Sequence, residues 1–251
     1  MIFPRIRPKP CFILFMSLVM IGCGGSSSST SPRQDINRVP GHIYDIGSTW
    51  DFYGDSETDG RAYDQIDAVS QAVAFTNILN ATINVTVSPN INGQGGDTLP
   101  QTYSRYLNSG TLNATWVHFQ ESGLKNIDEN TVEKFISAFN NMVSAIQTRS
   151  PNAIITVETA YSFEESDTPE PRNWDTYNAA MIQEIRRHHT NGNNIYLVEV
   201  DRNIKKLVEA KRNQLGFNNG QEAVWGGFLN NGEPLGNHYT GLGNFMIALS
   251  I

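Results

Sequence analysis

Residues 49–60, TWDFYGDSETDG, contain the junction between the first predicted strand and the helix that follows it. The first five residues have the aromatic and β-branched character of a strand, and a helical pattern begins near Tyr63. Ser56 therefore stands at a strand-to-helix junction. Such a serine has an exposed hydroxyl, and its backbone N–H is free because the start of a helix leaves its first N–H groups without intrahelical partners. Ser56 is a candidate nucleophile that could also help to hold an oxyanion.

Apolar runs alternate with amphipathic stretches along the rest of the chain, which is typical of βα units and a largely parallel sheet. Strands are predicted at residues 49–53, 83–87, 114–119, 153–158 and 194–200. Helices are predicted at residues 63–79, 129–148, 174–189 and 203–213, the second of them capped by Asp128. The pattern predicts an α/β fold: a flavodoxin-like, three-layer α/β/α domain around a five-stranded, mainly parallel sheet.

The first 22 residues resemble a bacterial lipoprotein signal peptide. A cationic start precedes the apolar run 11–21, which is too short to cross a bilayer as a helix. The run ends in Met-Ile-Gly-Cys, which resembles a lipoprotein cleavage box, and the resemblance implies that Cys23 carries a lipid. Plain secretion with a cysteine near the cleavage site is the alternative. Residues 23–41 are predicted to form a Gly/Ser-rich tether and residues 42–251 one domain. The resemblance further implies that this domain is held at a membrane of the bacterial cell envelope and faces the periplasm or the exterior.

Cysteine content and charge narrow the classes of protein further. Cys11 and Cys23 are the two cysteines of the chain, so the exported domain has no disulfide and must be stabilised by a hydrophobic core. The net charge is −7, and three of the 18 basic residues lie in the first 22. An acidic domain without basic clusters argues against nucleic-acid binding and against electrostatic docking on anionic lipid.

Two more segments carry residues suited to catalysis. Residues 92–98, NGQGGDT, contain glycines that let a backbone approach a ligand closely, so that N–H groups can point at a developing negative charge. This segment matches neither a dinucleotide fingerprint nor a P-loop; the alternative is a turn in which Asp97 caps a helix. Residues 236–246, GNHYTGLGNFM, place His238 before a short apolar helix. A serine needs such an imidazole to take its proton at neutral pH, although a lone loop histidine is more often structural.

The order and spacing of these three segments resemble the SGNH, or GDSL, hydrolase family of esterases and lipases, over essentially the whole mature domain. The family has Gly-Asp-Ser after strand one, Gly-x-x-Gly-Asp/Glu-Thr after strand two and a histidine five residues before a glycine in the closing helix. The resemblance implies that Ser56 is the nucleophile and His238 the general base. It also implies that the backbone N–H groups of Ser56 and Gly96 form part of the oxyanion hole, and that no metal or organic cofactor is required.

The chain departs from the family at two positions. The family supplies an asparagine side chain to the oxyanion hole from a Gly-x-Asn-Asp block, where this chain has Ser-Gly-Leu-Lys-Asn at residues 122–126. Asn126 is the candidate donor in its place, and Ser122 is a weaker one. The family also has an aspartate three residues before the histidine, where this chain has Leu235. The carbonyl of Leu235, or the carboxylate of Glu233 as an acid, could orient the imidazole instead.

The expected substrate is an ester, on an acylated glycan or a lipid. Loops rich in aromatic and amide side chains, with Trp174, Phe217 and Trp225, suit a sugar, so removal of acetyl groups from a polysaccharide is the first hypothesis and a lipase or lysophospholipase the second. A tethered binding module that kept the fold and lost its chemistry is an alternative of another class. A calcium loop over residues 55–66 is disfavoured because Ile66 stands where a bidentate glutamate is needed.

Overall fold

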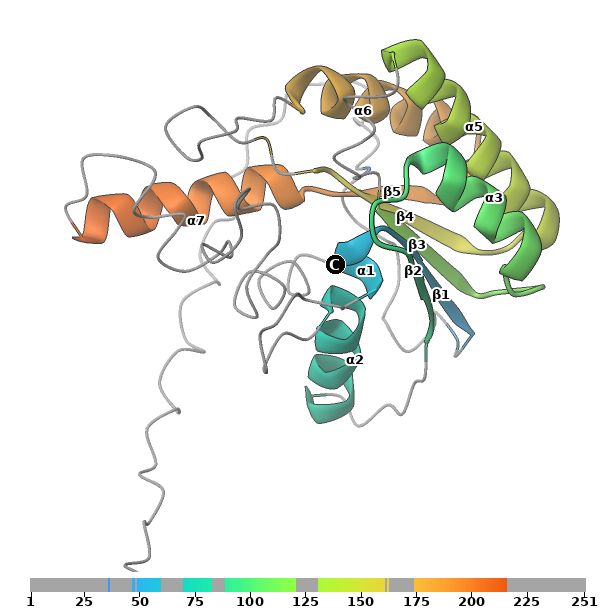
Figure 1. Cartoon of the computed structure of the whole chain (residues 1–251), viewed down its shortest axis with the longest axis horizontal. Helices are drawn as coiled ribbons and strands as arrows, with labels where there is room; N and C mark the ends of the chain where they lie inside the picture. Colours follow the sequence, from blue (N-terminus) through green and yellow to red (C-terminus); the bar gives the residue numbers. More distant parts are fainter. Residues whose placement is uncertain are drawn as a thin grey trace, which may run out of the picture. The chain divides into compact units, whose positions relative to one another are not determined.

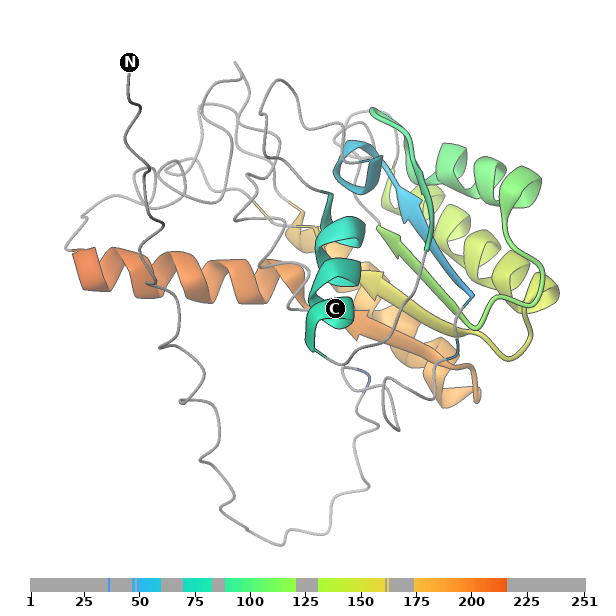
Figure 2. The ribbon, with the colours of Figure 1, turned by 90° about the horizontal axis from the view of Figure 1, so that it is seen from below.

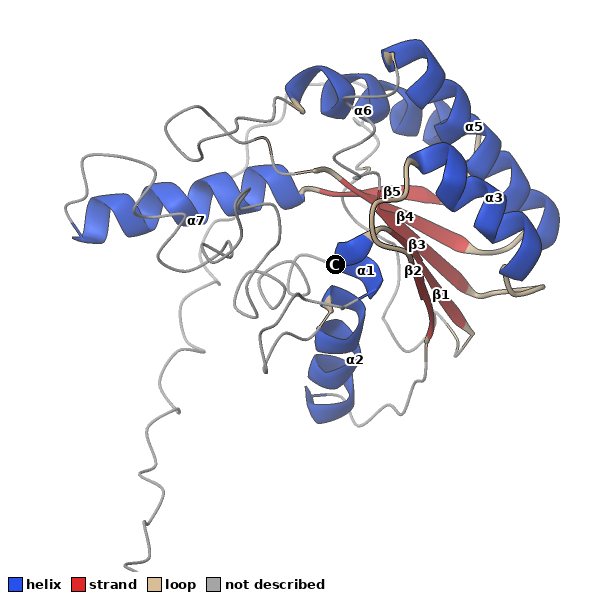
Figure 3. Ribbon diagram, in the orientation of Figure 1, coloured by secondary structure: helices blue, strands red, loops and turns tan. Residues whose placement is uncertain are grey.

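The computed structural model describes residues 36, 47, 49–59, 70–82, 89–120, 131–160, 162 and 174–215, which all belong to the unit formed by residues 34–251. Their centre is a parallel sheet in the order β2-β1-β3-β4-β5 (Figure 3). The strands are β1 (Trp50–Gly54), β2 (Asn90–Gly93), β3 (Trp116–Gln120), β4 (Ile154–Glu158) and β5 (Ile195–Val198). The predicted α/β class and the five-stranded parallel sheet are confirmed.

Helices cover both faces of this sheet, as a three-layer fold requires. They are α1 (Ser56–Asp59), α2 (Gln71–Thr82), α3 (Leu99–Ser109), α5 (Val132–Arg149), α6 (Asp175–Thr190) and α7 (Val200–Leu215). Helices α3, α5 and α6 lie along one face, and α2 lies against the other (Figures 1 and 2). Each long βα crossover brings the chain back to the side of the sheet where the strands begin, so all five strands run the same way. We call the side where the strands begin the amino edge of the sheet, and the side where they end the carboxyl edge.

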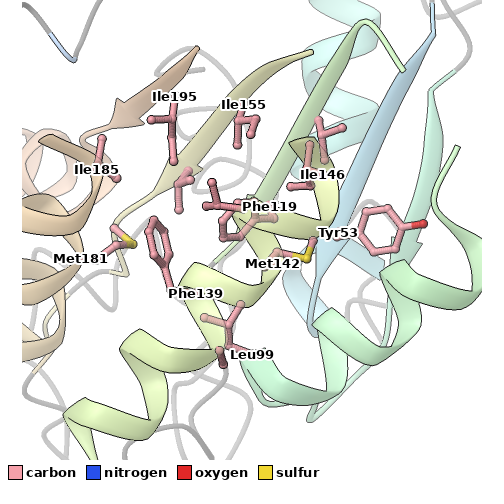
Figure 4. Packing of buried hydrophobic residues seen from close by; sticks show 14 of the residues in the cluster. Tyr53, Leu99, Phe119, Phe139, Met142, Ile146, Ile155, Met181, Ile185 and Ile195 are labelled. Carbon is pink, nitrogen blue, oxygen red and sulfur yellow. The ribbon is translucent and has the colours of Figure 1, made fainter. Parts of the chain in front are cut away.

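The face under α3, α5 and α6 carries the larger hydrophobic core (Figure 4). Alternate strand residues point into it because successive side chains of a strand face opposite sides. Helix α5 contributes an apolar stripe to this core: Phe135, Phe139, Met142, Val143 and Ile146 are buried, and Val132 and Ile136 are half-buried against them. Full burial of each such side chain stabilises the fold by about 1.5–3 kcal/mol.

The opposite face has a smaller, aromatic core under α2. Trp50 and Trp116 meet edge to face, with ring centroids 4.9 Å apart and planes at 77°. Phe75 of α2 lies over both strands, 5.2 Å from Trp116 and 6.2 Å from Phe52. Edge-to-face aromatic pairs of this kind add about 0.5–1.5 kcal/mol each to the area they bury. This face ends in polar side chains near the carboxyl ends of the strands.

Some local predictions differ from the structure. Strand β2, Asn90–Gly93, was not predicted, and the strand predicted at 83–87 lies outside the described residues. Thr131 rather than Asp128 caps α5, since its hydroxyl accepts a hydrogen bond from the Lys134 N–H at 3.3 Å. Helix α3 is likewise capped by Thr98 and not by Asp97. Both threonines have the extended backbone of an N-cap, and at α3 the Gln101 Oε1 accepts a hydrogen bond from the Thr98 N–H at 2.7 Å.

Two helix boundaries also differ from the prediction. Helix α7 begins at Val200, three residues earlier than predicted, directly after β5. Of the predicted helix at 63–79, the described part is α2 from Gln71 onward; residues 60–69 lie outside the described residues. Among the helices that the structure describes, none is long and apolar enough to cross a membrane.

Candidate active site

Ser56 is the first residue of α1, two residues after the end of β1. Helix α1 is a single turn, in which the Asp59 N–H donates to the Asp55 carbonyl at 3.0 Å. Because Ser56 lies at the N-terminus of this turn, its backbone N–H has no partner within the helix. The structure therefore places the candidate nucleophile at the carboxyl edge of the sheet, next to the central strands, where sites in open α/β folds form.

Gly54 makes room for the start of α1. A Cβ at Gly54 would collide with the hydroxyl of Thr58 and would lie 2.7 Å from Gln120 Oε1. Those two side chains are buried, and the Thr58 hydroxyl donates to Gln120 Oε1 at 3.0 Å. This hydrogen bond attaches the single turn of α1 to the end of β3, and it explains why the motif has a glycine at its first position.

Gly93 plays the same part at the end of β2, where it pairs with Gly54. A Cβ at Gly93 would collide with the backbone of Asp59 and lie 2.6 Å from the Thr58 carbonyl carbon. Helix α1 can therefore rest directly on the last residue of β2 only while that residue has no side chain. Two glycines, one on each strand, decide where the backbone of Ser56 lies.

Gly96 lies in the turn that follows β2. Its φ is +76°, a left-handed conformation that glycine adopts without strain. Two backbone hydrogen bonds shape the turn: the Gln94 N–H donates to the Gly54 carbonyl at 3.1 Å, and the Asp97 N–H donates to the Gln94 carbonyl at 3.1 Å. The first bond joins the Gly96 turn to the strand that leads into Ser56. The two segments predicted to form an oxyanion hole thus lie side by side.

The other predicted site residues fall outside the described residues: His238, Asn126, Ser122, Glu233 and Leu235. Cys23 and the proposed signal peptide also lie outside them. Trp174, expected on a sugar-binding rim, is instead 2% exposed and packs edge to face on Tyr177 at 5.5 Å. Its role is to anchor the core, so the sugar-rim interpretation is wrong for this residue.

His118 of β3 belongs to a buried polar cluster. Its Nε2 lies 3.3 Å from Glu158 Oε2 and its Nδ1 lies 2.9 Å from the hydroxyl of Thr156. The indole of Trp116 donates to the same hydroxyl at 2.7 Å, and the Gln71 amide donates to Glu158 Oε1 at 3.1 Å. The imidazole of His118 is fully buried with partners at both ring nitrogens, so it is not available to act as a base for Ser56.

The remaining two described histidines, His188 and His189, lie in the last turn of α6, near the amino ends of the strands and away from Ser56. Among the residues that the structure describes, no group of three metal-ligating side chains is close enough to hold a metal ion.

The sequence did not indicate two side chains that support the carboxyl edge near Ser56. Gln120 receives the Thr58 hydroxyl, and Arg105 of α3 reaches back to the same junction. A signal for the second existed, because Arg105 is the single charged residue in LPQTYSRYLNS, the sequence of α3. A lone charge in a helix that follows a glycine-rich turn needs a partner nearby, and Asp97 lies in that turn.

No family model and no curated protein matches the chain. Solved structures do match. A family 3 carbohydrate esterase from Clostridium thermocellum superposes with a TM-score of 0.58 at 17% identity, over 81% of this chain and 93% of that one. Axe2, an acetylxylan esterase from Geobacillus stearothermophilus, gives 0.58 at 15% identity, over 82% and 93%. A member of the lipolytic protein G-D-S-L family from Veillonella parvula gives 0.51 at 12%, over 81% and 96%. These likenesses show a shared fold, the one that the sequence predicted.

Proposed function

We propose that this chain is a serine ester hydrolase of the SGNH type. One observation carries the proposal: the N-terminus of α1, with Ser56, and the left-handed turn at Gly96 meet at the carboxyl edge of the sheet. Backbone N–H groups held in this way can stabilise the oxyanion of a tetrahedral intermediate, which is the largest single contribution in acyl transfer. The fold shared with named esterases supports the proposal.

In the proposed reaction the Ser56 hydroxyl attacks the ester carbonyl while His238 takes its proton. The negative charge that develops on the carbonyl oxygen is held by the N–H groups of Ser56 and Gly96, with the amide of Asn126 as a third donor. His238 then gives the proton to the leaving alcohol, and an acyl-enzyme remains. Water, deprotonated by His238, attacks this acyl group and releases the acid, which restores the Ser56 hydroxyl. The imidazole is oriented by the Leu235 carbonyl or by Glu233.

The test of the reaction is covalent labelling. A fluorophosphonate probe should modify the purified, folded wild-type protein at Ser56 and should leave Ser56→Ala unmodified, because the probe reacts with an activated serine. His238→Ala should reduce labelling strongly. Absence of Ser56-dependent labelling in folded protein would contradict the enzyme and favour the alternative, a binding module that has lost its chemistry.

For the substrate, we propose acetyl groups on a polysaccharide. The names of two structural neighbours, a carbohydrate esterase and an acetylxylan esterase, support this choice, and the name of a third, a lipolytic protein, supports lipid esters as the second candidate. Nitrophenyl esters from acetyl to palmitoyl separate the two. Acetyl preference together with acetate release from acetylated xylan is the expected result; strong preference for long chains would favour the lipase.

We further propose that residues 1–22 are removed and that Cys23 carries the lipid that holds the domain at a membrane of the cell envelope. The apolar run before Met-Ile-Gly-Cys and the Gly/Ser-rich tether after it support this. Metabolic labelling with an alkyne fatty acid should mark the wild-type protein and not Cys23→Ala. A wild-type protein released unlabelled into the medium would instead indicate plain secretion.

A further inference from the structure

We propose that Arg105 is a positioning residue that keeps the two backbone donors of the oxyanion hole, Ser56 N–H and Gly96 N–H, at the right separation. The inference rests on the proposed function, and it adds a side chain that neither the sequence motifs nor the shared fold assigns. Ser56 and Gly96 come from different βα loops, so a side chain that binds both loops can set the distance between them.

The first part of the argument is the pair of carbonyls that Arg105 binds. Its Nη1 donates to the Asn92 carbonyl at 2.5 Å and to the Gly54 carbonyl at 3.2 Å. Gly54 is the last residue of β1, two before Ser56, and Asn92 is in β2, four before Gly96. One guanidinium therefore ties together the two strand ends from which the donors emerge. A planar guanidinium with several N–H groups suits such bridging better than an ammonium, which acts as a point charge.

The second part is the ion pair with Asp97, whose Oδ2 contacts Arg105 Nη2. Asp97 directly follows Gly96, which has no side chain of its own to hold it in place. The two partners are 22% and 15% exposed, so the pair is partly shielded from water and stronger than a fully exposed one. The turn around Gly96 is thus held on one side by the Gln94–Gly54 backbone bond and on the other by Arg105.

The base of Arg105 is itself rigid. Thr98 caps α3 with its N–H bonded to Gln101 Oε1 at 2.7 Å, and Leu99 and Tyr106 are buried in the core. Burial lowers the pKa of the Arg105 guanidinium, while the negative charges of Asp59 and Asp55 act in the opposite direction. An arginine begins so far above neutral pH that it keeps its charge throughout the working range. Arg105 therefore acts as a permanent brace and takes no part in proton transfer.

The expected effect follows from how steeply catalysis depends on placement. A displacement of about 1 Å in a reacting group can cost on the order of 100-fold in rate, and loss of one oxyanion donor costs about 100- to 1,000-fold in kcat. Such losses fall on the transition state and not on ground-state binding, so KM should change little.

The chain offers a matched control in Arg149, at the end of α5. Its guanidinium also donates to two backbone carbonyls, those of Leu107 at 3.3 Å and Gly110 at 2.6 Å, but at the amino edge of the sheet, away from Ser56. Arg105→Met and Arg149→Met therefore remove the same kind of contact from the two edges. Both should lower the melting temperature, which measures the structural part of each role.

The experiment compares these two variants with Arg105→Lys and the wild type. Turnover of p-nitrophenyl acetate is divided by the number of active serines, counted by end-point titration with a fluorophosphonate. Arg105→Met should lose about tenfold or more in kcat per active serine with little change in KM. Arg105→Lys should recover part of that loss, because it keeps the charge beside Asp97. Arg149→Met should keep the wild-type kcat. A kcat in Arg105→Met equal to that of Arg149→Met would overturn the proposal.

A second measurement separates failure of this inference from failure of the proposed function. Amide hydrogen exchange over residues 92–98 should accelerate in Arg105→Met and stay at the wild-type rate in Arg149→Met. A wild-type protein that neither labels nor hydrolyses esters would contradict the proposed function, and the exchange rates would then still decide whether Arg105 braces this turn. Unchanged exchange in Arg105→Met would overturn the brace itself.

Discussion

At the amino edge of the sheet, side chains close the loops: Asp51, 1% exposed, accepts hydrogen bonds from the Thr111 N–H at 2.8 Å and the Thr111 hydroxyl at 2.6 Å. At the carboxyl edge, side chains are missing where the loops leave, since Gly54 and Gly93 end their strands and Gly96 forms the turn. Both edges use an arginine that bonds backbone carbonyls. At the amino edge these side chains close the loops, whereas at the carboxyl edge glycines let backbone segments approach one another directly.

This contrast has a physical reason. A catalytic edge that uses N–H groups as donors must leave backbone uncovered, and it loses the stability that side-chain packing would supply there. The opposite edge has no such restriction and can satisfy its polar groups internally. Pairs of equivalent substitutions, one at each edge, should therefore separate activity from stability.

The largest difference is expected for a pair of serines. Ser56→Ala should lower ester hydrolysis by at least about 10⁴-fold, as removal of a catalytic serine does elsewhere, with little change in melting temperature. Ser150, at the amino edge, accepts from the Ala114 N–H at 2.9 Å and is 2% exposed. Ser150→Ala should lower the melting temperature by a few degrees and leave kcat per active serine unchanged. Equal residual activities in the two variants would contradict the assignment of Ser56.

A pair of glycines should show the next largest effect. In Gly93→Ala the new methyl group collides with the backbone of α1, so we expect kcat to fall by about 100-fold. A Cβ at Gly110 would meet the Tyr106 ring at 2.6 Å, at the amino edge. Overpacking of this kind costs about 1–3 kcal/mol of unfolding free energy, so both variants should melt earlier. Only Gly93→Ala should lose turnover per active serine; wild-type kcat in that variant would mean that α1 can shift without consequence.

Two threonines give a smaller contrast. Thr58→Val keeps the shape of the side chain but leaves the buried Gln120 Oε1 without its donor, at a cost of about 1–3 kcal/mol. Because this bond attaches α1 to β3, kcat should also fall, by about tenfold. Thr111→Val removes the hydroxyl bond to Asp51 and should destabilise the fold by a similar amount without loss of kcat. Thermal melts and kcat per active serine, measured on both proteins, test the pair. A loss of kcat in Thr111→Val alone would contradict the assignment of the reaction to the carboxyl edge.

The smallest expected effect is a pH dependence at the amino edge. Burial, aided by the charge of Arg187, lowers the pKa of His188, which lies 2.7 Å from Asn140 Oδ1 through its Nε2. The unfolded chain, with a histidine pKa of about 6.5, takes up this proton first as the pH falls. The contribution of neutral His188 to stability is thus complete above that pKa and is lost as the pH falls through its lower folded value.

The melting temperature of the wild type should therefore fall more between pH 7 and pH 5 than that of His188→Gln. Hydrolysis by the two proteins should have the same pH profile, in which kcat/KM falls toward acid pH because the proposed base, His238, becomes protonated. A shifted rate profile in His188→Gln would show that the two edges are coupled.

Comparison of strands shows what pattern reading could and could not find. The strands β1, β3, β4 and β5 were placed to within a few residues, because each is buried and reads as an apolar run. Strand β2, Asn-Ile-Asn-Gly, was not predicted. It is the outermost strand of the sheet and its residues are exposed or half-buried, so no apolar run marks it. Its place depends on pairing with β1, which a local pattern does not contain.

For the candidate site, too, the sequence motifs predicted some contacts and not others. The motifs predicted that the segments of Ser56 and Gly96 would meet, and the structure places them side by side. They did not indicate Gln120, Arg105 or the pairing of His118 with Glu158, since those contacts join residues 40 or more positions apart or bridge two loops. Trp174 illustrates the opposite failure, because a residue type that suits a sugar is here enclosed by the core.

The sequence by itself determined the alternation of strands and helices, the parallel sheet and the junction that holds Ser56, because periodicity and glycine placement are local properties of a chain. The tertiary structure alone decided which side chains support that junction: the Thr58–Gln120 bond, the close approach of Gly93 to α1 and the reach of Arg105 across two strand ends. These contacts depend on strand order and register, and those are settled when distant segments bury their apolar faces together.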